Sequence, residues 1–259
     1  MTPEEVRPWA GAGFASSDAV EAKEMPVTTP GRTAVPGPTW ETLCRVRRGP
    51  DSLTVMRDET IGSFLTRLAA RSAAPGGGAV GALHAAQAAA LLAMVARFSD
   101  GPRYDAETVG RVRAAADGLA DEGVGLAVAD SAAFEKVIAA YGLPRDTPEA
   151  QAARSDAIAD AMAGAARPPA DLMAASLRLV GLAEELLPVA NKNVISDIAA
   201  AAAAISAAAV TAALNIEANL TSIKDPALAE ELAATAALAD GVTDRAGRVV
   251  AAIREEIAQ

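Results

Sequence analysis

Apolar residues recur with helical spacing along most of residues 56–259, and no stretch alternates apolar and polar positions as a strand would. In the first such segment, Ile61, Leu65 and Leu68 fall on one helical face. Capping residues, prolines and glycines divide the region into about seven predicted helices, with the third expected to break near Gly123 or Gly125. Their predicted ranges are 58–72, 79–98, 105–141, 147–168, 170–190, 196–224 and 226–258.

Two of these segments are nearly free of charge. Residues 79–96 and 198–216 contain no Asp, Glu, Lys or Arg, so their length alone would allow a membrane span. Both consist mostly of alanine, glycine and serine, which contribute little transfer free energy, and we therefore predict no membrane association. We interpret them as central helices of an all-α bundle, surrounded on all sides, whose small side chains allow close backbone approach. Such a thin core also favours stabilisation through a homodimer interface.

The first 55 residues have a different composition. They hold seven of the fifteen prolines, both tryptophans and the only cysteine, Cys44, without periodic apolar spacing. We expect an irregular tail over residues 1–55, either genuinely disordered or lying upstream of a natural start at Met56. Acidic residues and the lack of a continuous apolar core exclude a secretory signal at the N-terminus, so we expect a cytoplasmic protein.

Charge and composition narrow the possible functions. A formal net charge of −10 argues against a nucleic-acid-binding surface, which must neutralise phosphates. With one cysteine and one histidine, the chain can form neither an internal disulfide nor a Cys/His metal cluster. A zinc hydrolase and a thiol protease are therefore poor candidates, and we expect no metal site.

A polar stripe interrupts the second apolar segment. Thr211, Asn215 and Asn219 recur every four residues and so share one helical face. They either hydrogen-bond across the bundle or line a ligand cleft, because a buried amide without a partner costs about 1–3 kcal/mol. Asp197 lies five turns earlier on that face, roughly 27 Å away, so both ends can serve one ligand only if it is long or if the site is shared across a dimer.

Three further features are weaker leads. The run Gly76-Gly77-Gly78 leads into a helix whose free N–H groups can receive an anion or a carbonyl oxygen. His84 follows about two turns later, and it is either a core histidine or a catalytic base. Asp130 is a carboxylate within an apolar stretch, and two interpretations stay open. Burial would raise its pKa toward the range useful for acid–base catalysis, whereas a solvent-exposed helix face would give the same sequence.

Several short blocks occur in an order that resembles the cyclodeaminase/cyclohydrolase family of one-carbon folate enzymes. The resemblance spans essentially residues 57–259 and rests on the blocks at 75–80, 101–104, 130–134, 141–144, 191–197 and 214–220. It implies an all-helical homodimeric domain, found as the C-terminal half of formiminotransferase-cyclodeaminase and as a separate methenyltetrahydrofolate cyclohydrolase. The sequence departs from the pattern at Ala79, where a serine is expected, and at His84, where a small residue is usual.

The resemblance implies a tetrahydrofolate derivative as the substrate and no further cofactor. Since no formiminotransferase half accompanies the domain, we prefer hydrolysis of 5,10-methenyltetrahydrofolate to cyclodeamination of the 5-formimino compound. A helical interaction protein without catalytic activity is the remaining alternative. Asp130 or Asp197 would move the proton, with His84 as a third catalytic candidate. The candidate substrate-binding residues are Gly76, Gly77, Gly78, Arg103, Tyr104, Asn191, Lys192, Ser196, Asn215 and Asn219.

Overall fold

The computed structural model describes residues 56–259, and the irregular tail expected over residues 1–55 lies outside this range. Within the described residues the chain is helical and contains no strand, which confirms the predicted all-α class. Two 3-10 turns, η1 and η2, join α7 to α8. The elements are α3 Ile61–Ala69, α4 Gly77–Phe98, α5 Ala106–Tyr141, α6 Pro148–Ala165, α7 Arg167–Leu186, η1 Leu187–Val189, η2 Lys192–Val194, α8 Ile195–Leu220, α9 Pro226–Ala236 and α10 Leu238–Ile257.

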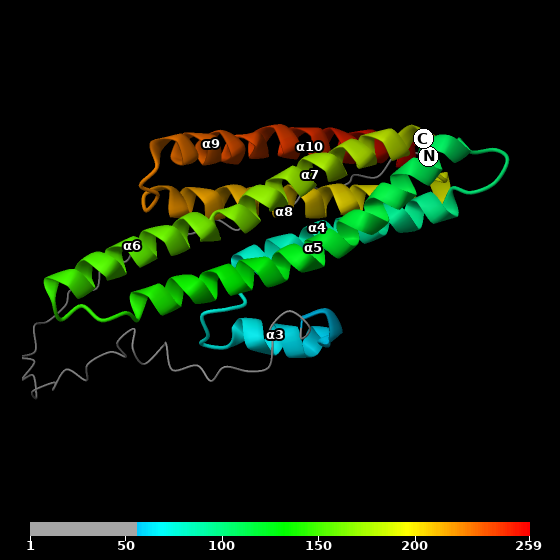
Figure 1. The fold of residues 1–259 in the computed structure, drawn as a ribbon. Helices are drawn as coiled ribbons and strands as arrows, with labels where there is room; N and C mark the ends of the chain where they lie inside the picture. Colours follow the sequence, from blue (N-terminus) through cyan, green and yellow to red (C-terminus); the bar gives the residue numbers. More distant parts are fainter. Residues whose placement is uncertain (1–55) are drawn as a thin grey trace, which may run out of the picture. The chain divides into compact units, whose positions relative to one another are not determined.

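The two alanine-rich helices, α4 and α8, pack against each other at the centre of the bundle (Figure 1). Helices α5 and α7 also contact α4, while α7, α9 and α10 contact α8. Gly81 near the start of α4 meets Thr211 near the end of α8, while Asn191, shortly before α8, donates a hydrogen bond to Phe98 at the end of α4. The two helices therefore run antiparallel. The first turn of α4 therefore lies beside the last turns of α8.

Side-chain caps explain where several helices begin. The Oγ1 atom of Thr60 accepts a hydrogen bond from the N–H of Ser63 at 3.1 Å, before α3. Asp105, Thr147 and Asp225 cap α5, α6 and α9 in the same way, and a proline follows the last two caps. Each cap contributes about 1 kcal/mol, because it satisfies an N–H that has no partner within the helix.

The third predicted helix is unbroken, and Gly123 serves packing instead of a turn. Helix α5 runs for 36 residues through both glycines at which a break was expected. A Cβ atom at Gly123 would lie 2.9 Å from the backbone N of Ala86 and 3.0 Å from the carbonyl oxygen of Ala82. Because a glycine in a helix costs only about 1 kcal/mol, the close approach of α5 to α4 outweighs its poor helix propensity.

The last predicted helix is in fact two helices, divided at Ala237. Both halves pack on α8: Leu232 and Ala236 are buried from α9, and Ala239 and Val242 from α10. No glycine or proline marks the division in the sequence, so tertiary packing, not local propensity, sets it.

The alanine-rich helices are not surrounded on all sides, contrary to the expectation from their composition. The segments Gly77–Phe98 and Lys192–Leu220 are both long and apolar enough to cross a membrane, and 61% and 39% of their apolar windows are buried in the bundle. Helix α8 keeps Val210 and Leu214 exposed, at 45% and 60%. The bundle therefore covers only part of α8, and an apolar strip of that helix faces outward.

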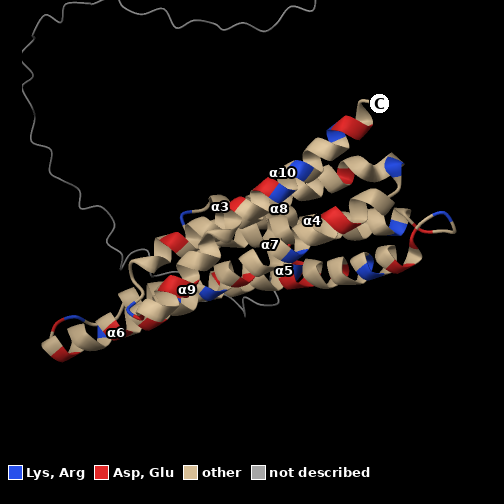
Figure 2. Cartoon of the chain, turned by 90° about the horizontal axis from the view of Figure 1, so that it is seen from above, with Lys and Arg blue, Asp and Glu red and all other residues tan. Residues whose placement is uncertain are grey.

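Positive and negative side chains are interspersed along the helices, and the two central helices carry few of them (Figure 2). Ion pairs join neighbouring helices, including Arg97–Asp117 between α4 and α5 at 2.8 Å and Arg178–Glu122 between α7 and α5 at 2.9 Å. Both pairs are about half exposed, so each contributes roughly 0–1 kcal/mol. Apolar packing therefore supplies most of the stability.

Replacing Gly123 by alanine is expected to lower the free energy of unfolding by about 1–3 kcal/mol, because the added methyl group would meet the backbone of α4. Gly125→Ala is the matched control: it lies two residues away in the same helix and nothing surrounds its Cβ position within 4 Å. That variant should gain up to about 1 kcal/mol from helix propensity. Urea denaturation of both variants checks the ordering, and a Gly123→Ala protein as stable as Gly125→Ala would contradict it.

Candidate active site

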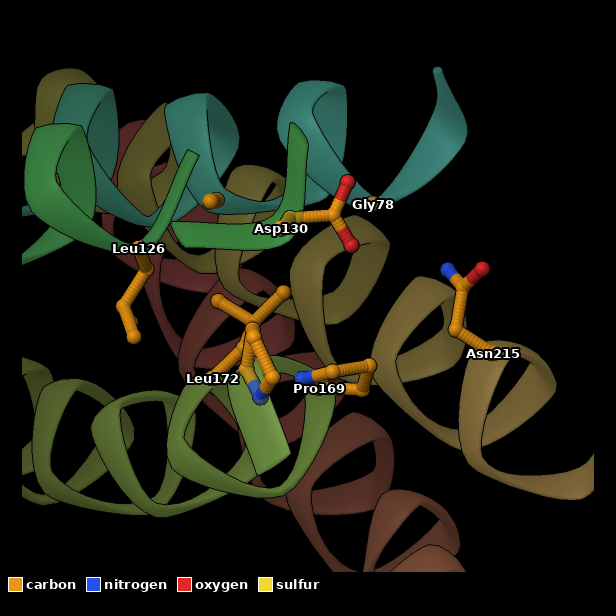
Figure 3. Close-up of a pocket in the computed structure, with 8 residues that line it drawn as sticks. Gly78, Leu126, Asp130, Pro169, Leu172 and Asn215 are labelled. Atoms are coloured by element: carbon orange, nitrogen blue, oxygen red, sulfur yellow. The ribbon is translucent and has the colours of Figure 1, made fainter. Parts of the chain in front are cut away.

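A cleft of about 230 Å³ opens where the first turn of α4 meets α5, the start of α7 and the last turns of α8. Figure 3 shows the Asp130 carboxyl beside Gly78, and the amide of Asn215 projecting from α8 toward the same space. Leu126 and Leu172 line a smaller hollow that shares Asp130 and Asn215 with this cleft. The residues that line the cleft are Ala73, Ala74, Gly76, Gly77, Gly78, Asp130, Phe134, Ala165, Pro169, Asn215, Ala218 and Asn219.

Of the described residues that line the cleft, Asp130 alone is ionisable. Its side chain is half-buried, and loss of hydration raises the pKa of the carboxyl above its ordinary value. A hydrogen bond from the backbone N–H of Ala79 acts in the opposite direction and is the smaller effect. The Asp130 carboxyl, which projects from α5, therefore lies at the cleft beside the start of α4 and has a raised pKa.

The polar stripe of α8 bonds within its own helix and does not bond across the bundle. Thr211 donates through Oγ1 to the carbonyl of Ala207 at 2.7 Å, and Asn215 donates through Nδ2 to the carbonyl of Thr211 at 2.8 Å. Asn219 donates to the carbonyl of Asn215 at 2.8 Å. These bonds hold the amide groups in fixed orientations, and both asparagines line the cleft.

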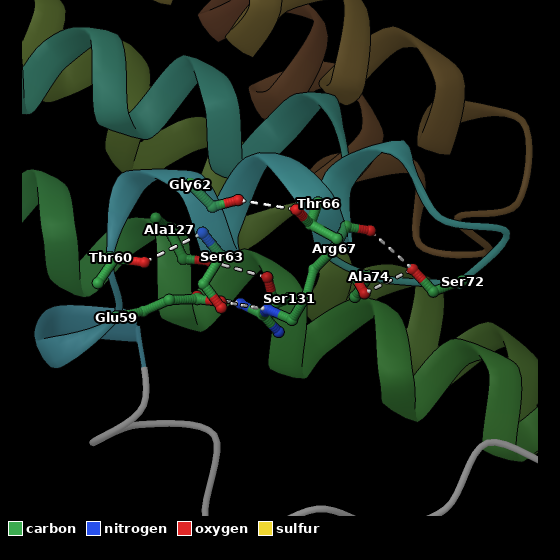
Figure 4. A network of polar contacts seen from close by, with 10 residues as sticks. All are labelled: Glu59, Thr60, Gly62, Ser63, Thr66, Arg67, Ser72, Ala74, Ala127 and Ser131. Atoms are coloured by element: carbon green, nitrogen blue, oxygen red, sulfur yellow. Dashed lines mark hydrogen bonds and ion pairs between the residues drawn. The ribbon is translucent and has the colours of Figure 1, made fainter.

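A polar network anchors the segment between α3 and α4, which forms one wall of the cleft (Figure 4). The Ser72 hydroxyl donates to the carbonyl of Ala74 at 3.1 Å. Arg67 at the end of α3 donates twice to Glu59, at 2.8 and 2.7 Å, and this pairing lowers the pKa of the Glu59 carboxyl. The network fixes the chain that leads into the glycine run.

Six of the sequence-predicted site residues lie at the opposite end of the bundle. Arg103 and Tyr104 follow the last turn of α4, roughly 33 Å along that helix from Gly77, and the Arg103 guanidinium lies 4.9 Å from the centre of the Tyr104 ring. Asn191, Lys192, Ser196 and Asp197 surround the start of α8. No residue of this group lines the cleft.

Two residues of the distant group have structural contacts that account for them. Asn191 donates through Nδ2 to the carbonyl of Phe98 at 2.8 Å, and its backbone N–H donates to the buried Ser99 hydroxyl at 2.8 Å. Lys192 forms an ion pair with Glu256 of α10 at 2.6 Å. These contacts tie the segment before α8 to the ends of α4 and α10.

His84 also lies outside the cleft, on α4. It is half-buried, with Gln87 exposed one turn later, which places it toward the outer side of the helix. Among the described residues, its Nδ1 atom is buried without a hydrogen-bond partner. The structure therefore does not bring His84 together with Asp130.

Sequence reasoning missed Phe134 and Pro169. Phe134 is four residues after Asp130, so helical periodicity alone could have placed it on the same face, and it is 42% exposed at the cleft. Pro169 sits in the first turn of α7 and reaches the cleft only through the tertiary fold, for which the sequence gives no local signal.

Comparisons with known proteins agree with the resemblance in the sequence. A methenyltetrahydrofolate cyclohydrolase from Methylorubrum extorquens is 36% identical over 177 residues, which make up 67% of this chain and 85% of that protein. A formimidoyltransferase-cyclodeaminase from Rattus norvegicus is 32% identical, and the matched region spans 33% of its length. The crystal structure of a formiminotetrahydrofolate cyclodeaminase from Thermotoga maritima matches with a TM-score of 0.69 and 27% identity, covering 79% of this chain and 100% of that chain.

The family match covers most of the described residues and includes both Asp130 and the polar stripe of α8. It extends from residue 60 to residue 238. On this match and the 36% identity to the cyclohydrolase, the chain belongs to the Formiminotransferase-cyclodeaminase family.

Proposed function

We propose that this protein hydrolyses 5,10-methenyltetrahydrofolate to 10-formyltetrahydrofolate, with Asp130 as the proton carrier. The proposal depends on one observation: the described part of the cleft contains a single ionisable group, a carboxyl of raised pKa, beside two oriented amides. The match to the Methylorubrum extorquens methenyltetrahydrofolate cyclohydrolase supports the proposal, because it covers 85% of that enzyme's length.

Asp130 would act first as a base and then as an acid. A water molecule attacks the bridging carbon between N5 and N10, and the Asp130 carboxylate takes one of its protons. The C–N5 bond of the tetrahedral adduct then breaks, and Asp130 returns that proton to N5. The second proton leaves to solvent as the formyl C=O forms on N10. The carboxylate also faces the positive charge of the methenyl bridge, which favours its ionised form.

The cleft fits the pterin end of the substrate. Its volume of about 230 Å³ lies below the roughly 300–1,000 Å³ typical of sites that enclose drug-sized ligands, so the glutamate tail would extend outside. Asn215 and Asn219 would accept hydrogen bonds from the pterin, and the half-exposed Phe134 ring offers a stacking surface. The free N–H groups at Gly76–Gly78 are the anion-binding feature nearest the cleft.

Cyclodeamination is the second candidate, favoured by the match to the Thermotoga maritima cyclodeaminase along that chain's full length. In this reaction N10 attacks the carbon of the protonated formimino group (–CH=NH2⁺) on N5, which gives a tetrahedral adduct with a terminal NH2 group. Asp130 would carry the N10 proton to that NH2 group, and the bond from carbon to the terminal nitrogen then breaks, so that ammonia leaves and the cationic methenyl bridge remains. Parallel assays for loss of methenyltetrahydrofolate absorbance and for ammonia release from the 5-formimino compound separate the two activities.

The proposal includes a homodimer formed through the exposed strip of α8. Ala200, Ala203, Ala207, Val210 and Leu214 fall on one face of that helix, and no charged residue occurs from 198 to 216. An uncharged apolar strip on a long helix is typical of a protein–protein interface. The dimer implied by the sequence resemblance would cover it.

The proposed chemistry uses water as co-reactant and needs no cofactor beyond the folate substrate. We further propose a cytoplasmic location, since a chain with one cysteine suits a reducing compartment.

Asp130→Asn is expected to lower kcat about 10²–10⁴-fold with little change in KM, because the amide cannot carry the proton. Asp197→Asn should retain most of the turnover, since Asp197 lies roughly 27 Å from Asn215 along α8. Asp160→Asn, at an exposed position of α6, controls for the loss of one negative charge. Full activity in Asp130→Asn would refute the proposed role. A wild-type protein that converts neither folate and is not thermally stabilised by a folate analogue would be a non-catalytic bundle.

The raised pKa of Asp130 also predicts a pH-dependent gain of stability in Asp130→Asn. Between the unfolded-state pKa of about 3.9 and the raised native value, the native state binds more protons than the unfolded chain, so wild-type stability falls as pH rises through this window. Asp130→Asn should therefore have the higher Tm at pH 7, and the difference should vanish below about pH 3.9. Thermal denaturation across this range measures it, with Asp160→Asn as control. A lower Tm for Asp130→Asn at pH 7 would contradict the assignment.

Leu214→Glu is expected to convert the dimer to a monomer, because it would place a charge within the apolar strip. Ile257→Glu is the matched control, since Ile257 is 63% exposed at the end of α10, away from the strip. Sedimentation velocity should show a twofold lower mass for Leu214→Glu only. If both variants keep the wild-type mass, the interface lies elsewhere or does not exist.

A further inference from the structure

The Asp130 carboxyl occupies the position that a side chain at residue 78 would take. A Cβ atom built on Gly78 would lie 2.0 Å from Oδ1, 2.4 Å from Cγ and 2.6 Å from Oδ2 of Asp130. Atoms that are not bonded to each other do not approach so closely, since carbon atoms in contact are about 3.5–4.0 Å apart. The carboxyl is therefore seated directly on the backbone of the first turn of α4 (Figure 3).

This seat is specific to one of the three consecutive glycines. Nothing lies within 4 Å of a Cβ atom placed on Gly76 or Gly77. Gly78 is also not in the left-handed region that favours glycine, so its backbone conformation does not explain the missing side chain. What distinguishes Gly78 from its neighbours is the carboxyl group of Asp130.

The conflict at Gly78 differs in kind from that at Gly123. At Gly123 an added methyl group meets the backbone of α4, which cannot move without separating two helices. At Gly78 all three close atoms belong to the end of one side chain, which can rotate away about its own bonds. A side chain at residue 78 would therefore displace the carboxyl and leave the fold intact.

We propose that Gly78 is a positioning residue for Asp130: the absence of a side chain lets the carboxyl rest against the start of α4, with its oxygens held at the cleft. The position of the carboxyl against Gly78 follows from the geometry alone. The effect of Gly78 on catalysis rests on the proposed function. It assigns Gly78 a role that acts through Asp130, distinct from direct contact with the substrate.

The seat has two effects on Asp130. It places the carboxyl within reach of the Ala79 N–H at the positive end of the helix dipole, and it removes water from the side of the carboxyl that faces α4. Loss of hydration is the larger effect and raises the pKa of the carboxyl. Within residues 56–259, no other residue that lines the cleft is ionisable.

Gly78→Ala tests the proposal, with Gly77→Ala as the matched variant from the same glycine run. The primary readout is the titration of the Asp130 carboxyl carbon by ¹³C NMR in aspartate-labelled protein, with Asp130→Asn identifying the signal. In Gly78→Ala the midpoint should fall toward the ordinary aspartate value of about 3.9, because the displaced carboxyl turns to solvent. In Gly77→Ala it should stay at the raised wild-type value.

The kinetic readout separates positioning from general disruption. In Gly78→Ala, kcat should fall about 100-fold with a nearly constant KM, as expected for a proton carrier displaced by about 1 Å. Gly78→Ser should behave like Gly78→Ala, since any Cβ atom causes the same conflict. Circular dichroism and Tm should match wild type in all three variants to within a few degrees.

Each result bears on the proposal. An unchanged titration midpoint in Gly78→Ala overturns it, as does a shifted midpoint with undiminished kcat in an active enzyme. Should the wild type convert neither folate, the proposed function fails, while the substrate-independent titration still decides whether Gly78 seats Asp130.

Discussion

The close approach of α4 to its neighbours is the constraint on which the rest of the structure depends. Because glycine has no side chain, α5 comes into contact with the backbone of α4 at Gly123, and the Thr211 side chain of α8 packs directly on Gly81 of α4. Only at this separation does Asp130, on α5, reach the first turn of α4. The same glycine and alanine residues that give the core its small side chains therefore also bring Asp130 to the cleft.

The two ends of the bundle differ in the polar groups that they carry. At one end, the start of α4, the start of α7 and the last turns of α8 leave a hollow with one carboxyl and two oriented amides. At the other end, hydrogen bonds of Asn191 and the ion pair of Lys192 tie the helix termini together. The first end therefore has the groups suited to chemistry, and the contacts at the second end hold the helix termini together.

Helical periodicity and capping residues predicted the all-α class and most helix boundaries. They failed at Gly123, which looked like a break, and at Ala237, where a predicted helix divides, because in both places packing between distant segments decides the outcome. For the site, an apolar setting correctly marked Asp130 as a carboxyl of raised pKa, and the glycine run and two asparagines lie with it at the cleft. Asp197, Arg103 and Lys192 were grouped with them through the family resemblance. Helical rise already placed Asp197 about 27 Å from Asn215, and the structure keeps these three residues at the other end of the bundle. Pro169 could not be predicted as a site residue, because only the tertiary fold places it at the cleft.

The location of the bound pterin tests the account most directly. A crystal structure of the full chain with a non-hydrolysable reduced-folate analogue would measure the distance from the bridging carbon to the Asp130 carboxyl oxygens. We expect the pterin in the cleft between Gly78, Phe134 and Asn215, with that distance short enough for one intervening water molecule. A pterin bound instead beside Arg103 and Asp197, with the cleft empty, would contradict the account.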